Sequence, residues 1–133
     1  KKIDIAIFSA AVSDFKPKKL LKYKKNKNKF KKIDLTKNMD IVKTISTDKK
    51  NRPKLVIAFA AETNNLLHKA KAKLKNKGCD WIIGNEINNK NKVFGSDYNK
   101  IVLINNNFVT KYKKMTKINI AKIITRKIIQ NNN

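Results

Sequence analysis

The sequence predicts an α/β fold: a Rossmann-like, three-layer arrangement with a mostly parallel sheet, followed by a C-terminal β-hairpin and helix. Short apolar runs alternate with segments of helical periodicity, which is typical of strand-helix-strand units. Two of these runs, residues 54–60 and 81–84, are apolar enough for strands that are buried on both faces, as parallel strands are. The last third changes to a hairpin pattern and an amphipathic helix.

The first part of the chain predicts a strand, an exposed excursion and a short helix. The apolar residues 3–8 indicate a buried strand. The stretch 16–32 is rich in lysine and lacks glycine, which predicts an exposed loop or flap. Apolar and polar residues alternate over 33–35 and indicate a short strand, after which we expect Asn38 to cap a helix over 39–46.

The middle of the chain has the clearest strand-helix-strand pattern. Residues 54–60 predict a central parallel strand, and 81–84 a second buried strand that should lie parallel to it. Between them, 66–77 carries apolar residues at four-residue spacing, which predicts a helix. Residues 62–65 are rich in helix-capping side chains, and Gly78 is expected to end the helix.

The C-terminal part predicts a hairpin and a final helix. Residues 100–104 and 108–112 flank three asparagines and indicate a β-hairpin that extends the sheet as an antiparallel edge. An unpaired edge invites pairing, so this hairpin is a candidate contact between two copies. Thr116 should cap the last helix, whose apolar face contains Ile120, Ile123, Ile124 and Ile128.

The length of the chain, 133 residues, is that of one domain with a substantial core. We find no internal repeat and treat 1–133 as a single domain. The chain opens without an initiator methionine and enters a predicted strand almost at once. We therefore expect it to be a segment of a longer protein.

The charge of the chain suggests a nucleic-acid partner, but its composition argues against one. The formal net charge is +24, which is typical of proteins that bind nucleic acid or anionic membranes. Nearly all cations are lysines, and only Arg52 and Arg126 provide the fork geometry that phosphate and base recognition favour. A chain-wide excess of lysine, asparagine and isoleucine is instead typical of AT-rich codon usage. We expect no specific nucleic acid, and keep a basic RNA-binding domain as the alternative.

Cysteine usage and hydropathy exclude several other classes. The single Cys79 excludes an internal disulfide, and with one histidine it forms no metal-ligand cluster. We expect Cys79 and Trp81 to be core residues and His68 to lie at the surface. There is no signal-like start and no apolar run long enough to cross a bilayer, so we expect a cytoplasmic protein with no membrane partner.

A candidate nucleotide site follows the first predicted strand. Ala10 and Ala11 lie just beyond its carboxyl end, where open α/β sheets bind ligands, and their small side chains allow close approach. Asp14 offers an acceptor, and the lysines of 22–25 can neutralise a polyphosphate. The same residues are compatible with ordinary packing at a strand end. No Gly-x-Gly-x-x-Gly follows a strand, which argues against a dinucleotide-dependent oxidoreductase.

A second group of cations lies on the predicted helix 66–77. Lys69, Lys73 and Lys77 follow one another at four-residue spacing and form a stripe. The usual meaning of such a stripe is a solvated face. Spacing alone therefore does not assign these lysines to a ligand.

Five ordered blocks of sequence closely resemble phosphopantothenate-cysteine ligase (phosphopantothenoylcysteine synthetase), the C-terminal part of the bifunctional bacterial coenzyme A biosynthesis flavoprotein. The blocks are residues 10–17, 22–25, 37–42, 59–65 and 80–85. The resemblance runs from about residue 3 to residue 129, and the order and spacing of the blocks make it specific.

The resemblance implies a reaction and its participants. It implies CTP-dependent ligation of cysteine to 4'-phosphopantothenate through an acyl-cytidylate, with pyrophosphate and CMP as the released products. It also implies Mg²⁺, whose ligands the sequence does not identify, and a homodimer with sites near the subunit interface. A flavin-dependent phosphopantothenoylcysteine decarboxylase domain is implied as a fused or associated partner.

The resemblance further implies roles for individual residues. Lys22 matches the first lysine of the family's Lys-x-Lys-Lys motif, which supports formation of the acyl-cytidylate and makes Lys22 the implied catalytic residue. Because the spacer after Pro17 is shorter than in many relatives, Lys24 and Lys25 are alternatives for this role. The implied nucleotide-binding residues are Ala10, Ala11, Asp14, Lys22, Met39, Asp40, Ile41, Val42, Phe59, Lys73 and Lys77. Lys69 stays a surface residue in this interpretation.

The chain departs from the family pattern at two points. Met39 stands where the family usually has proline, in the segment that recognises cytosine, so the preference for CTP over ATP stays open. Family members also begin with a further glycine-rich strand-helix segment that carries an asparagine acting on the acyl-cytidylate. We therefore expect the isolated segment to have little or no ligase activity and the full-length parent to be active. A purely structural domain is a further alternative.

Overall fold

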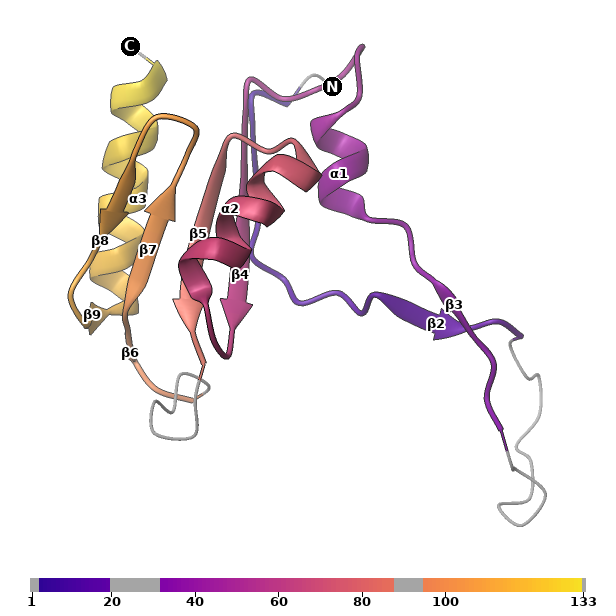
Figure 1. Cartoon of the computed structure of the whole chain (residues 1–133). Helices are drawn as coiled ribbons and strands as arrows, with labels where there is room; N and C mark the ends of the chain where they lie inside the picture. Colours follow the sequence, from indigo (N-terminus) through magenta and orange to yellow (C-terminus); the bar gives the residue numbers. More distant parts are fainter. Residues whose placement is uncertain (1–2, 20–31, 88–94, 133) are drawn as a thin grey trace.

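The computed structural model describes residues 3–19, 32–87 and 95–132 of the chain (Figure 1). In chain order, the elements are β1 (Ile5–Phe8), β2 (Phe15–Pro17), β3 (Leu35–Lys37), α1 (Ile41–Ser46), β4 (Leu55–Glu62), α2 (Leu66–Lys77), β5 (Trp81–Glu86), β6 (Tyr98–Asn99), β7 (Ile101–Ile104), β8 (Val109–Lys111), β9 (Met115–Thr116) and α3 (Lys117–Asn132).

The central layer is a mixed sheet of five strands within the described residues, in the order β1-β4-β5-β7-β8. Strands β1, β4 and β5 are parallel, and β7 and β8 continue the sheet in antiparallel fashion. The predicted α/β class is confirmed, as are the strand-helix-strand unit and the C-terminal hairpin. The hairpin ends the sheet at β8, but its proposed role as a contact between copies stays a prediction.

Helices cover both faces of this sheet and make three layers. Figure 1 shows α1 and α2 on one side of the sheet, called here the α2 face, and α3 on the other, the α3 face. Side chains alternate between the two faces along each strand. Val56 and Ala58 on β4 therefore pack with α2, whereas Leu55 and Ile57 pack with α3. The buried positions of Trp81 and Cys79, at 3% and 5% exposure, confirm both as core residues.

Strands β2 and β3 form a two-stranded ribbon that extends away from the five-stranded sheet (Figure 1). The strand predicted over 33–35 is thus shifted, since it begins at Leu35 and pairs with Phe15–Pro17. The ribbon accounts for both ends of the expected flap, whose residues 20–31 lie outside the described residues. Phe15 and Leu35 expose about half of their surface.

The start of α1 differs from the prediction by two residues. Asp40, not Asn38, is the N-cap, and its carboxylate accepts the backbone N–H of Lys43 at 3.0 Å. Asn38 instead donates its side-chain amide to the carbonyl oxygen of Ser13 at 2.7 Å, which joins the start of α1 to the segment after β1. An amide can donate to a carbonyl and a carboxylate only accepts, so Asn38 and Asp40 divide the two tasks.

The connection from β4 to α2 also differs from the prediction. Glu62 is the last residue of β4 and pairs in register with Glu86, so it does not belong to a capping segment. Asn65 is the N-cap of α2 in a left-handed conformation, with φ of 48° and no hydrogen bond from its side chain to the helix. The predicted end of the helix is confirmed, because Gly78 adopts φ of 67°. Thr116 is also confirmed as a cap, since its hydroxyl oxygen accepts the N–H of Asn119.

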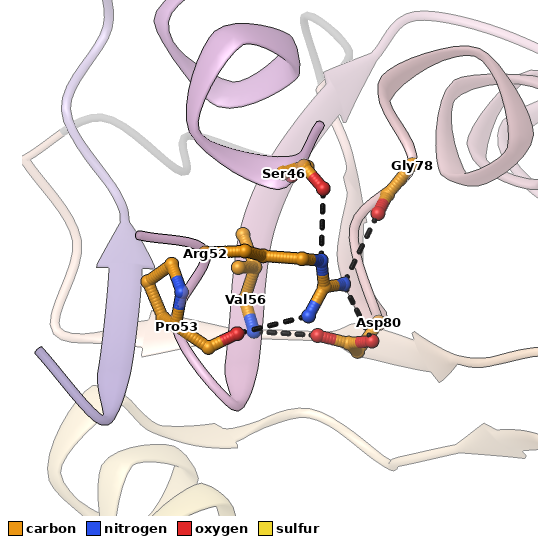
Figure 2. A network of polar contacts seen from close by, with 6 residues as sticks. All are labelled: Ser46, Arg52, Pro53, Val56, Gly78 and Asp80. Carbon is orange, nitrogen blue, oxygen red and sulfur yellow. Dashed lines mark hydrogen bonds and ion pairs between the residues drawn. The ribbon is translucent and has the colours of Figure 1, made fainter. Parts of the chain in front are cut away.

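Arg52 joins four segments at the amino ends of β4 and β5 (Figure 2). Its guanidinium donates to Asp80 Oδ1 at 2.9 Å, and the second carboxylate oxygen of Asp80 accepts the N–H of Val56 at 2.7 Å. It also donates to three backbone carbonyl oxygens, of Ser46 at 2.8 Å, Pro53 at 2.9 Å and Gly78 at 3.3 Å. The ends of α1 and α2 are thereby attached to the start of the two central strands.

Replacing Arg52 by lysine tests this junction, because a single ammonium cannot reach four acceptors held in a fork geometry. We expect Arg52→Lys to lower the free energy of unfolding by about 2–3 kcal/mol. The control is Arg126→Lys, the same change at an exposed position of α3, which should stay within about 0.5 kcal/mol of wild type. Urea unfolding followed by the fluorescence of the buried Trp81 measures both. Equal effects of the two changes would contradict the role of the junction.

Candidate functional site

The candidate site is built around two segments that meet, the one that leaves the carboxyl end of β1 and the start of α1. The segment that leaves β1 contains Ala10, Ala11 and Asp14, all of them exposed. The carbonyl oxygen of Asp14 accepts the backbone N–H of Asn38 at 2.8 Å, which holds this segment beside the start of α1. The structure thus brings together two of the sequence blocks predicted to bind a nucleotide, although they are separated by the whole ribbon.

The start of α1 presents an open surface. Met39 is 68% exposed and Ile41 is 39% exposed, whereas Val42 turns inward and packs against the core of the α2 face. Asp40 lies between them as the N-cap of the helix. The side chains of Met39 and Ile41 are therefore available to a ligand at the start of α1.

Asp40 also ties α1 to α2. The ammonium of Lys77, at the end of α2, donates to Asp40 Oδ2 at 3.0 Å. Partial burial acts to raise the pKa of Asp40, but the hydrogen bond from the Lys43 N–H and the neighbouring Lys77 outweigh it and lower the pKa below its ordinary value. The carboxylate is thus charged and paired, and the ammonium of Lys77 is held beside the start of α1.

Glu62 holds the other end of the lysine stripe. Its side chain is only 11% exposed, and its two oxygens each accept one lysine: Oε1 pairs with Lys73 at 2.6 Å and Oε2 with Lys69 at 3.4 Å. The hydrogen bond from Lys73 is the largest cause of a lowered pKa of Glu62, against the opposing effect of burial. Lys69 donates in addition to Asn64 Oδ1 at 2.6 Å.

The stripe Lys69, Lys73 and Lys77 is therefore not a plain solvated face, because each ammonium contacts a carboxylate. Glu62 was missed as a site residue by sequence reasoning, which placed it among capping residues. One signal was available: the chain has nine acidic residues, and one of them, Glu62, stands shortly before the lysine stripe that begins at Lys69. The sequence does not reveal which lysines the carboxylate of Glu62 contacts, since these contacts depend on the packing of α2 on β4.

Phe59 is separated from these lysines. It lies two residues after Ile57 on β4, so both side chains point to the same face of the sheet. Its register partner Ile83 belongs to the core on the α3 face. Its ring, 38% exposed, is therefore on the opposite face of the sheet from Lys73 and Lys77. The structure places Lys77 at the start of α1 and Lys73 at Glu62, and it places Phe59 apart from both.

The remaining predicted residues lie outside the site or outside the described residues. Lys22, Lys24 and Lys25 fall within 20–31, so the predicted catalytic lysine lies outside the described residues. Burial raises the pKa of the Cys79 thiol to about 11, which argues against a nucleophile. In residues 3–19, 32–87 and 95–132, no group of three or more His, Cys, Asp or Glu side chains is suited to a metal ion. No helix in these ranges is long and apolar enough to span a membrane.

Comparison with known proteins gives consistent matches. Residues 1–131 match the family described as DNA/pantothenate metabolism flavoprotein C-terminal domain. The coenzyme A biosynthesis bifunctional protein CoaBC of Borreliella burgdorferi is 44% identical over 129 residues, covering 94% of this chain and 32% of that protein. The protein of the same name from Bacillus subtilis is 35% identical over 101 residues, covering 75% of this chain and 24% of the relative.

The fold is also found in a solved structure. The crystal structure of the C-terminal domain of coenzyme A biosynthesis bifunctional protein CoaBC matches with a TM-score of 0.71 and 27% sequence identity. The match covers 98% of this chain and 56% of that domain. This chain therefore spans a little over half of the solved domain and a smaller part of the full-length relatives.

The pairing of Glu62 predicts a pH dependence of stability. Because its pKa is lower in the folded state than the value of about 4.3 in an unfolded chain, the pairing stabilises the fold above that pH. The contribution is lost as the pH falls through the folded-state pKa. We expect wild type to exceed Glu62→Gln by about 1 kcal/mol in free energy of unfolding near pH 6, since the lysines are partly solvated.

Urea unfolding of both proteins at about pH 6 and about pH 3 measures this difference. The difference should shrink as the pH falls through the folded-state pKa of Glu62, because protonation of the carboxyl removes the charge that pairs with the lysines. Groups other than Glu62 titrate in both proteins and cancel. A difference that is the same at both pH values would show that the charge of Glu62 does not stabilise the fold.

Proposed function

We propose, because this chain belongs to the DNA/pantothenate metabolism flavoprotein C-terminal domain family, that it binds CTP as part of a phosphopantothenate-cysteine ligase. The family match confirms the resemblance predicted from the five sequence blocks. The names of the relatives, bifunctional coenzyme A biosynthesis proteins, support a place in coenzyme A biosynthesis. The activity, substrates and partners below are proposals for this chain.

The proposed reaction has two steps. The carboxylate of 4'-phosphopantothenate attacks the α-phosphate of CTP, and pyrophosphate leaves, so that an acyl-cytidylate forms. The amine of cysteine then attacks the acyl carbon, CMP leaves, and an amide bond is made. Charge develops on phosphoryl oxygens in the first step, and cationic side chains are the groups that stabilise it best. We propose Lys22 for this catalytic role on the resemblance alone, with Lys24 and Lys25 as alternatives.

The observation that carries the proposal is the pair of lysines on α2 that carboxylates hold in place. Lys73 and Lys77 lie one turn apart on α2, their side chains are 42% and 27% exposed, and both are fixed by carboxylates. An ammonium has three donors, so a bond to one carboxylate leaves donors for a phosphate. A triphosphate carries roughly four negative charges, and two oriented cations supply part of the complement.

The base of the nucleotide is proposed to lie at the start of α1. The segment of Met39, Asp40, Ile41 and Val42 matches the family's cytosine-recognising segment, and its exposed apolar side chains provide a surface for a planar ring. Asn38 holds this segment beside Asp14, Ala10 and Ala11, where a ligand can approach the backbone closely. Since Phe59 lies on the other face of the sheet, we propose for it only a place at the rim of the site.

Further participants follow from the same proposal. Mg²⁺ is the proposed companion of the triphosphate and would add to the neutralisation of its charge, held mainly by phosphate oxygens and water as this ion prefers. Cysteine is the second substrate, and a homodimer is the proposed assembly. The names of the relatives as bifunctional proteins support a flavin-dependent decarboxylase domain as a fused or associated partner.

Calorimetric titration with CTP and Mg²⁺ at moderate salt tests the proposed function. We expect selective binding of CTP over ATP, weakened about tenfold by Lys73→Gln or Lys77→Gln, since each removes a charge-assisted hydrogen bond to phosphate. The matched control is Lys75→Gln, an exposed lysine on the same helix, which should bind CTP like wild type.

RNA is the second ligand in this experiment, because the net charge of +24 favours a basic RNA-binding domain as the alternative. Binding to RNA that falls steeply with salt, with no binding of CTP, would contradict the proposed function. Equal losses in the Lys73, Lys77 and Lys75 variants would show that only overall charge matters.

A further inference from the structure

Glu62 combines three properties that set it apart among the described carboxylates. It is the last residue of the central strand β4, its side chain is largely buried, and it pairs with two lysines of the neighbouring helix. Its backbone is held by the neighbouring chain segment: Glu62 pairs in register with Glu86 of β5, and its carbonyl oxygen accepts the N–H of Ile87 at 2.8 Å. The carboxylate therefore projects from a rigid point of the fold.

The two lysines use different oxygens of this carboxylate and do not compete. Lys69 occupies Oε2 and is itself held by Asn64, so it orients the carboxylate from one side. Oε1 is then directed to Lys73, whose ammonium lies at 2.6 Å. A lysine side chain has four rotatable bonds and loses about 2 kcal/mol of rotamer entropy when fully ordered. A lysine ordered before the ligand arrives does not incur that cost on binding.

We infer that Glu62 is a positioning residue of the nucleotide site, which aims the ammonium of Lys73 at the phosphates of the ligand while Lys69 orients Glu62. The inference rests on the proposed function. It adds a residue that contacts no ligand to the site and gives Lys69 a role that the sequence did not indicate. In this arrangement, the carboxylate at the anchored end of β4 holds the lysines of α2. The ligand would contact Lys73 on the side of its ammonium that faces away from the carboxylate.

The sign of one substitution separates positioning from simple electrostatics. A carboxylate near a polyphosphate repels it, so if charge alone mattered, removal of Glu62 would strengthen binding of the nucleotide. If Glu62 positions Lys73, its removal weakens binding, because the free ammonium must be ordered by the ligand. The two accounts thus predict opposite changes of the dissociation constant.

The test is a double-mutant cycle on CTP binding, measured by calorimetry with Mg²⁺ on wild type, Glu62→Gln, Lys73→Gln and the double variant. We expect Glu62→Gln to weaken binding about five- to twentyfold, and to cause no further loss when Lys73 is already glutamine. The control is Glu86→Gln, which removes an equal charge from the exposed register partner of Glu62 and should weaken binding little or not at all.

A second variant keeps the charge and tests the geometry. Glu62→Asp is shorter by one methylene, so the charge account predicts wild-type affinity, whereas positioning predicts weaker binding. It also carries the test if Glu62→Gln does not fold. Unchanged or tighter binding in both variants, or equal losses in the presence and absence of Lys73, would overturn the inference alone. A wild-type chain that binds no CTP would overturn the proposed function and this inference with it.

Discussion

The junction of Arg52 with Asp80 sets the positions of the elements on which the candidate site depends. Asp80 precedes β5 and accepts the N–H of Val56, so the start of β5 is held against the second residue of β4. Arg52 adds the ends of α1 and α2 through the carbonyl oxygens of Ser46 and Gly78. With these ends held, the opposite end of α1 lies about 9 Å away along a helix of six residues. In a chain whose cations are almost all lysine, an arginine stands where four acceptors need one planar donor group.

The junction explains how Lys77 and Asp40 meet. Lys77 directly precedes Gly78, whose carbonyl oxygen is bound by Arg52, and Asp40 caps the first turn of α1. The ends of both helices are therefore fixed by the same arginine. The contact at 3.0 Å follows from the placement of the helices, and it contributes orientation of the lysine more than stability of the fold.

Burial distinguishes the ion pairs of the site from other pairs on this basic surface. The pairs Lys54–Asp4 and Lys32–Asp34 have side chains that are 64% or more exposed, and pairs of that kind contribute little because water and salt screen them. Glu62 is largely buried, so its attraction for Lys73 is screened less. On α2, carboxylates hold Lys69, Lys73 and Lys77 in place.

The local periodicity of the sequence determined the elements: the buried strands near 54–60 and 81–84, the helix over 66–77 and the hairpin before the last helix are all present. These elements can be predicted because burial of one face imposes a regular spacing of apolar residues on each helix or strand. Five ordered blocks also determined the family. Only the tertiary structure decided that Asp40 rather than Asn38 caps α1, and that Glu62 reaches Lys73 while Phe59 faces the other side of the sheet. Those outcomes depend on distances between segments far apart in the chain, and a one-residue shift along a strand reverses the face of a side chain.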